Sequence, residues 1–317
     1  MPAGNVLDRN AGFAKGQAQM WGFGLDTAID SHSYGAPGSK IFYVDPNNVQ
    51  CTDLGNLGED PIVPLATVAR AIVLCRDHQG DTIVVGANDF WSYAPHNRAT
   101  PILESVVIPS TKGGIRLIGV SSNPLGVSWS PAAANGVALT VHAVDVLIEG
   151  FAFYPGILAN CTGIVVEWSG AVSFGENVTI RNCFFETALD YGISLDYSWY
   201  AQIYDNYFEG IAVAAIFNTS VVGDPDFAHI HHNKFFKNVL AISLPTTDNS
   251  FIHDNLFMEA AGGTNNMIDL TGGTDNLVAN NFFSCTIIQY DTTCSDATSG
   301  AWLFNHCSDG SPVAPPT

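Results

Sequence analysis

Basic residues are scarce in this chain of 317 residues: 11 Lys and Arg stand against 30 Asp and Glu, a formal net charge of −19. Charged residues of both signs make up 13% of the sequence, about half of the usual share. Binding to a phosphate backbone or an anionic membrane requires a basic footprint. The composition therefore excludes nucleic acid as an expected partner. It also disfavours anionic polysaccharides, unless calcium bridges them to the protein.

Long apolar runs and paired cysteines are also lacking. No window holds 18 uninterrupted apolar residues, so we expect no membrane insertion. The first 13 residues lack the basic and then apolar stretches of a signal peptide. The seven cysteines include no CxxC pair, which argues against a zinc site or a disulfide scaffold. We expect Cys183 in the core, and one bridge among Cys285, Cys294 and Cys307 is possible, with its pairing left open.

What the second half of the chain does contain is a repeat of about 24 residues. Its pattern is an aliphatic residue, any two residues, Asn, any one residue, and Phe. One copy carries Cys183 in place of Asn, and a looser copy ends at Phe153. The repeated positions are Asn206, Asn233, Asn255 and Asn280, with Phe185, Phe208, Phe235, Phe257 and Phe282.

Each repeat carries a second short strand in which apolar residues alternate with others. These strands are expected at Ile164–Glu167, Ile193–Asp196, Ile216–Thr219, Ile242–Pro245 and Ile268–Thr271. Three short strands in about 24 residues fit one turn of a parallel β-helix, whose turns stack about 4.8 Å apart. The aliphatic residue and the Phe would point inward. The Asn would occupy a bend, tolerate left-handed dihedral angles and bond along a column of amides.

The layout resembles the right-handed parallel β-helix proteins, the pectate-lyase-like superfamily, over roughly residues 40–285. The repeated Asn residues correspond to the asparagine ladder of that superfamily. Residues 40–46 (KIFYVDP) resemble its opening strand, residues 64–77 its amphipathic capping helix, and residues 80–85 (GDTIVV) the strand that starts the coils. The resemblance implies an all-β, right-handed parallel β-helix with an N-terminal amphipathic capping helix. It leaves function open, because this fold hosts lyases, hydrolases, epimerases and non-catalytic spikes.

On this basis the chain divides into four parts. Residues 1–38 form an arm or attachment segment, and residues 39–110 form the N-terminal cap and first coils. Residues 111–290 form the β-helix coils, and residues 291–317 form a C-terminal cap and flexible tail.

Acidic and aromatic side chains follow two of the second strands. Glu167 and Asp196 fall on adjacent turns, where their carboxyl groups would be about 5–8 Å apart, within the span used for glycoside hydrolysis. They are the candidate catalytic pair. Aromatic rings beside them suit stacking on sugars and form a candidate glycan-binding set: Trp168, Tyr197, Trp199 and Tyr200. The alternative is that these side chains simply decorate the solvated face of an acidic protein.

A pectate-type lyase of this superfamily would need a Lys or Arg base and usually calcium. None of the basic residues of the repeat region, Arg181, Lys234 and Lys237, falls on the second strands. Asp224 and Asp226 share a loop, but calcium requires six to eight oxygen ligands, and two carboxylates supply too few of them. We therefore expect no cofactor, with calcium an unsupported alternative, and a glycoside hydrolase as the enzyme class if the chain is catalytic.

Histidines cluster near residue 230. His231 and His253 would face outward on adjacent turns, about 5 Å apart. The sequence favours a stack of imidazole rings beside Tyr204 over an adventitious metal site, and His232 is expected to be structural. We assign no metal ligands from the sequence.

Three functions remain open. The favoured one is a non-catalytic structural protein of a phage virion, namely a spike, fibre or decoration subunit, with or without glycan binding. It would be a homo-oligomer, most simply a trimer with Trp199, Tyr200 and Phe217 at the subunit contact, and would meet other virion proteins through residues 1–38. The alternatives are a glycoside hydrolase or tailspike depolymerase that degrades a neutral polysaccharide, and a secreted carbohydrate-binding or adhesive β-helix.

Overall fold

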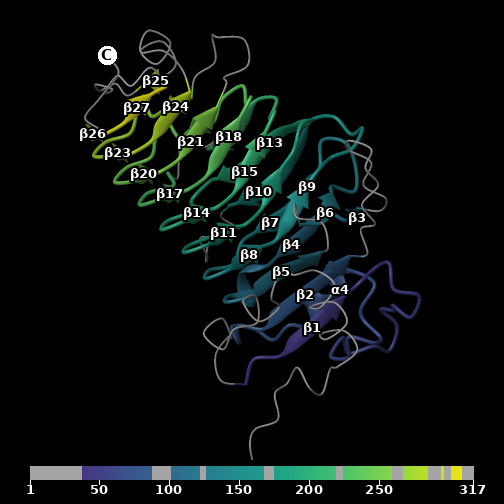
Figure 1. Ribbon diagram of the computed structural model, residues 1–317. Helices are drawn as coiled ribbons and strands as arrows, with labels where there is room; N and C mark the ends of the chain where they lie inside the picture. Colours follow the sequence, from purple (N-terminus) through teal and green to yellow (C-terminus); the bar gives the residue numbers. More distant parts are fainter. Residues whose placement is uncertain are drawn as a thin grey trace, which may run out of the picture.

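The computed structural model describes residues 38–87, 101–121, 126–167, 175–218, 224–258, 267–284, 294–295 and 301–308. These residues form a parallel β-solenoid. Its coils stack along one axis from the purple N-terminal end to the yellow C-terminal end in Figure 1. The predicted all-β, parallel β-helix fold is therefore confirmed. No helix among the described residues is long and apolar enough to cross a bilayer.

Three parallel sheets make the walls of the solenoid. Sheet A has ten strands in the order β1 (Ile41–Val44), β2 (Thr82–Ala87), β5 (Arg116–Ser121), β8 (Leu147–Glu149), β11 (Thr179–Arg181), β14 (Gln202–Tyr204), β17 (His229–His231), β20 (Phe251–His253), β23 (Leu277–Ala279) and β26 (Ala301–Leu303). Sheet B has nine, in the order β3 (Ile102–Leu103), β6 (Val127–Ser130), β9 (Phe151–Phe153), β12 (Phe184–Phe185), β15 (Tyr207–Glu209), β18 (Lys234–Phe236), β21 (Leu256–Met258), β24 (Phe282–Ser284) and β27 (His306–Cys307). Sheet C has eight, in the order β4 (Val106–Ile108), β7 (Val137–Val141), β10 (Cys161–Val166), β13 (Leu189–Leu195), β16 (Ala214–Phe217), β19 (Ile242–Ser243), β22 (Ile268–Asp269) and β25 (Cys294–Ser295).

Identical side chains meet in columns inside these walls, because the strands pair in register. Ile203, Ile230 and Ile252 are aligned across β14, β17 and β20, and all three are fully buried. In sheet B a column of stacked rings runs along the axis, with centroids 4.7–5.0 Å apart from Phe153 onward. The rings belong to Phe153, Phe185, Phe208, Phe235, Phe257 and Phe283. Offset and near-parallel stacking of this kind adds to the free energy gained by burying each ring.

Asparagine amides form a second column at the bend between sheets A and B. Asn233 Nδ2 donates to Asn255 Oδ1 at 3.1 Å and to the carbonyl oxygen of Ile203 at 2.8 Å. Asn255 Oδ1 also accepts from the backbone N–H of Asn233 at 2.9 Å. The same contacts recur from Asn206 to Asn233. Each buried amide therefore satisfies a backbone carbonyl and a backbone N–H of the preceding coil.

The predicted ladder is wrong in its last copy. Asn281, not Asn280, bonds to Asn255, and it donates onward to Asn305 Oδ1 at 3.1 Å. Likewise Phe283 is fully buried in the ring column, whereas Phe282 is 43% exposed. Asn280 instead takes the left-handed conformation at the bend, with φ of 56°.

That conformation belongs to the residue before each ladder position. Asp205, His232 and Asp254 have φ values of 55°, 55° and 53°. The sequence pattern predicts the left-handed bend at the ladder Asn itself. In the structure the bend and the ladder position are two different residues. The ladder Asn makes four side-chain hydrogen bonds, as Asn233 does, and the residue before it takes the left-handed conformation.

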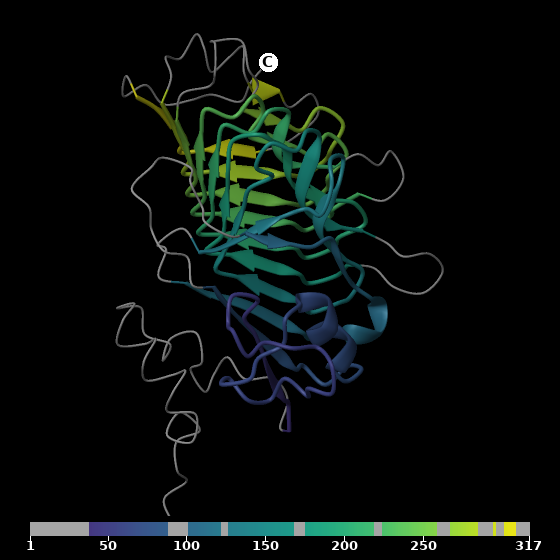
Figure 2. The same ribbon diagram turned by 90° about the vertical axis from the view of Figure 1, so that its right-hand side faces the viewer.

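A short helix, α4 (Val68–Leu74), lies beside β1 and β2 at the N-terminal end (Figure 2). It is shorter than the predicted residues 64–77. The backbone N–H of Leu65 donates to the carbonyl oxygen of Tyr43 at 2.8 Å, so this part of the segment is extended beside β1. Thr67 then caps the helix by accepting from the N–H of Arg70 at 3.1 Å. The buried face of the helix, with Val68, joins the apolar core of the coils.

The coils continue past residue 290, where the sequence suggested a C-terminal cap. β26 and β27 pair with the preceding coil, and Asn305 extends the amide ladder. Cys183 is buried as predicted, and burial raises the pKa of its thiol to about 12. Cys294 and Cys307 are buried in different sheets, and Cys285 lies outside the described residues. The predicted arm lies outside them too, except for residue 38.

Candidate functional site

Three polar side chains line up where strands of sheet C end. Val141, Val166 and Leu195 are partners in the register of β7, β10 and β13. The next residues are His142, Glu167 and Asp196. Their backbone N–H groups continue the ladder, since Glu167 donates to Val141 at 3.1 Å and Asp196 to Val166 at 2.8 Å. The structure therefore brings the predicted acid pair onto adjacent coils and adds a histidine on the coil before them.

Side-chain contacts join these groups to their neighbours. His142 Nε2 lies 3.1 Å from Glu167 Oε1, with side chains 21% and 43% exposed. Ser194 Oγ donates to Asp196 Oδ2 at 2.8 Å. A carboxylate held by an imidazole beside a second, hydroxyl-bound carboxylate has the group types that general acid–base chemistry uses. The catalytic roles of Glu167 and Asp196 stay predictions.

His142 is a site residue that the repeat pattern does not predict. Its position after Val141 is equivalent to that of Glu167 after Val166. The coil that contains His142 carries Phe153 but no ladder Asn, so the repeat pattern is weaker there than in the later coils. An alignment of the second strands of each coil, without the Asn and Phe positions, would have placed His142 opposite Glu167.

Side chains on the outer face of sheet C beside this site are more buried than the alternation of apolar and other residues along the strands predicts. Ser194 is only 2% exposed and Phe217 is 7% exposed. The ring of Tyr191 stacks on Phe217 with centroids 4.1 Å apart. Phe217 therefore packs within its own chain and exposes little surface to a partner, and its expected place in a subunit contact stays a prediction.

The structure describes three of the four aromatic residues predicted to bind glycans, and their glycan-binding role stays a prediction. Trp168 lies outside the described residues. Tyr197 is partly buried, and Trp199 and Tyr200 are 39% and 49% exposed at the corner that leads into β14. Tyr200 stacks on Phe227 of the next coil, with centroids 5.0 Å apart. The sequence analysis did not single out Phe227, which is 44% exposed and shares the left-handed conformation of Tyr200.

Sheet A carries Arg181, a basic residue whose side chain bonds to two neighbouring strands. Arg181 forms an ion pair with Glu149 at 2.8 Å and donates to the hydroxyl of Tyr204 at 2.9 Å. The Tyr204 ring continues into the predicted stack, 4.9 Å from His231, which lies 5.0 Å from His253. The expected column of imidazoles beside Tyr204 is confirmed. Within the described residues, no group of three or more His, Cys, Asp or Glu side chains has the geometry to hold a metal ion.

Comparisons with known proteins add little to this geometry. No protein-family model matches the sequence, and no curated protein matches it. Among solved structures, the chain is similar to ORF18 of Geobacillus virus E2, with 11% sequence identity and a TM-score of 0.24. The match covers 84% of this chain and 61% of the viral one, so this chain spans about three fifths of its neighbour's length. Membership of the pectate-lyase-like superfamily stays a resemblance in sequence pattern.

Proposed function

We propose that this chain is a non-catalytic structural protein of a phage virion, serving as a spike, fibre or decoration subunit. The observation that carries the proposal is the continuity of the interior columns. Stacked rings run from Phe153 to Phe283, and bonded amides run from Asn206 to Asn305. A solenoid whose successive coils repeat the same contacts extends along one axis, which is the shape that a projecting rod requires.

The exposed corner residues support assembly of such rods. Trp199, Tyr200 and Phe227 place partly exposed rings along one edge of the solenoid, and two of them are already stacked across coils. Aromatic residues are enriched in the buried cores of protein interfaces. We propose that this edge contributes to a homotrimer, and that residues 1–38 attach the rod to other virion proteins.

A second function is favoured by a specific observation, the alignment of Glu167 and Asp196 on adjacent coils with His142 beside them. This arrangement would suit a glycoside hydrolase that acts on a neutral glycan, as a free enzyme or a tailspike depolymerase. The acidic net charge of the chain would repel a polyanionic substrate.

Release of new reducing ends from a broad panel of neutral polysaccharides separates the two functions. A structural role predicts no release above a heat-treated control. A hydrolase predicts release that disappears in Asp196→Asn and Glu167→Gln, while the exposed control Asp60→Asn keeps it. Circular dichroism and the melting temperature confirm that each variant is folded. Release with that mutational pattern would overturn the non-catalytic assignment.

A further inference from the structure

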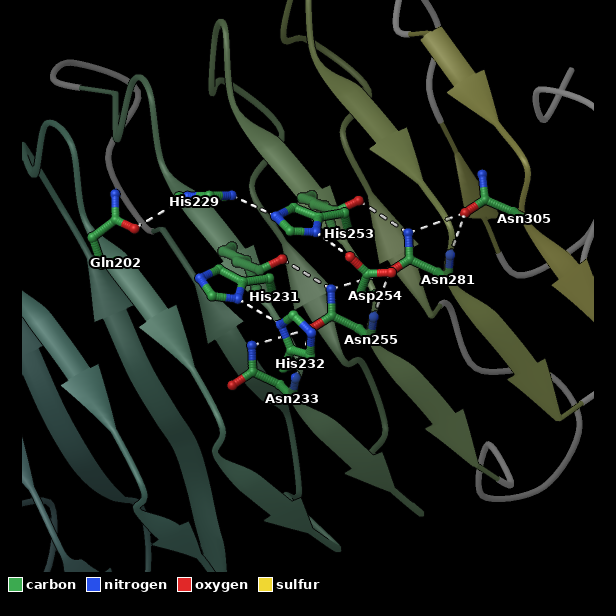
Figure 3. A network of polar contacts seen from close by, with 12 residues as sticks. Gln202, His229, His231, His232, Asn233, His253, Asp254, Asn255, Asn281 and Asn305 are labelled. Carbon is green, nitrogen blue, oxygen red and sulfur yellow. Dashed lines mark hydrogen bonds and ion pairs between the residues drawn. The ribbon is translucent and has the colours of Figure 1, made fainter. Parts of the chain in front are cut away.

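Two histidines face each other across coils on the outer side of sheet A (Figure 3). His229 opens β17 and His253 closes β20, the neighbouring strand. Their Nε2 atoms lie 2.5 Å apart, and both side chains are partly buried. The contact lies outside the candidate site on sheet C and does not depend on the virion assignment.

Hydrogen bonds at the outer ring nitrogens favour one tautomer of both imidazoles. His229 Nδ1 lies 3.1 Å from Gln202 Oε1, and His253 Nδ1 lies 2.6 Å from Asp254 Oδ2. An amide oxygen and a carboxylate oxygen accept hydrogen bonds, so each Nδ1 carries its hydrogen. When both rings are neutral, each Nε2 therefore carries a lone pair and no hydrogen. Two lone pairs on nitrogens 2.5 Å apart repel each other.

A cation between the two nitrogens would remove this repulsion. Neutral imidazole nitrogen is a common ligand for zinc, copper and nickel. We propose that His229 Nε2 and His253 Nε2 bind one divalent transition-metal ion on the surface of the solenoid.

The surroundings match what metal-binding histidines need. Such a histidine almost always donates its other N–H to a carboxylate, carbonyl or water, which fixes the ring and raises its basicity. Asp254 and Gln202 already provide these acceptors. Metal–nitrogen bonds of about 2.1 Å at a right angle place the nitrogens about 3 Å apart, so the rings need to separate by about half an ångström. Water would complete the coordination, since the described residues place no third His, Cys, Asp or Glu side chain for it.

Neighbouring rings hold the pair in place. Phe251 stacks on His253 with centroids 4.0 Å apart and on His229 at 5.3 Å. His231, the register partner of His253, stacks on it at 5.0 Å. Because the two ligands lie on different coils, a bound ion would link β17 to β20 and stabilise the folded state.

Calorimetric titration of the full chain with Ni²⁺ at neutral pH tests the proposal, since nickel binds imidazole without oxidising the thiols. We expect one saturable site per chain, and affinity at least about 10-fold weaker in His229→Gln and in His253→Gln. Asp254→Asn keeps a residue suited to the left-handed bend but removes the charge, so it should weaken binding about 10-fold. His306→Gln, an exposed histidine far along the chain, is the matched control and should bind like the wild type.

Saturating Ni²⁺ should also raise the melting temperature of the wild type and of His306→Gln, but not of His229→Gln. Absence of saturable binding in the wild type would overturn the proposal. Unchanged affinity in His229→Gln or His253→Gln would overturn it as well, because the ion would then be held by other ligands. Circular dichroism of each variant shows whether a loss of affinity reflects a loss of fold.

Discussion

Replacing Phe283 by Ala is expected to lower the free energy of unfolding by about 3–5 kcal/mol, the usual result of removing a buried aromatic ring. The ring is fully buried and stacks on Phe257 with centroids 4.8 Å apart and planes 7° apart. The cavity would lie inside the column, where the in-register neighbours cannot collapse into it without breaking their own stacking. Urea denaturation followed by circular dichroism measures the change.

The adjacent residue provides the control. Phe282 is 43% exposed and begins the same strand, so Phe282→Ala should change the free energy of unfolding by less than about 1 kcal/mol. The two variants remove the same group one position apart. A larger loss for Phe282→Ala than for Phe283→Ala would mean that the last coils are stacked in the other register.

The second large effect is expected at the centre of the amide ladder. Asn255 donates to Asn281 Oδ1 and to the carbonyl oxygen of Ile230, and it accepts from both the backbone N–H and the Nδ2 of Asn233. Asn255→Ala leaves these buried groups without partners. We expect a loss of about 2–4 kcal/mol, because an unsatisfied buried polar group costs more than an average hydrogen bond contributes. Thermal and urea unfolding of the same samples give the value.

Asn280→Gly is the matched control for the ladder. Asn280 sits at the bend with φ of 56°, a conformation that Gly adopts without strain, and it is exposed. Its replacement should change the stability by less than about 1 kcal/mol. Equal losses at Asn255 and Asn280 would contradict the assignment of one residue to the ladder and the other to the bend.

The coils could be predicted from the sequence because each strand turns one face to the core of the solenoid, so buried residues recur at a regular spacing. Aliphatic and aromatic residues that recur at a fixed spacing must stack when coils pair in register, so Asn206, Asn233 and Asn255 could be placed from pattern alone. The prediction failed at the last repeat for a physical reason. Asn280 and Asn281 are adjacent, as are Phe282 and Phe283, so the motif fits two registers. Backbone pairing decides between them, since Val278 is the partner of Ile252.

The candidate site was predicted less completely than the fold. Placing Glu167 and Asp196 on adjacent coils needed only the strand alternation. The hydrogen bond from Ser194 to Asp196 and the approach of His142 to Glu167 depend on rotamers, which periodicity does not specify. The facing Nε2 atoms of His229 and His253 lie on a diagonal between strands, whereas the sequence analysis compared only residues directly in register.

The most direct test of the proposed role is to locate the chain on assembled particles. Mass spectrometry and immunogold electron microscopy would be applied to gradient-purified phage particles that carry the gene for this chain. A structural protein of the virion should be present at a fixed copy number per particle, in multiples of three, with the label on a projecting appendage. Absence of the chain from purified particles, with recovery in the medium or on cell surfaces, would contradict the account and favour a secreted adhesive or enzymatic β-helix.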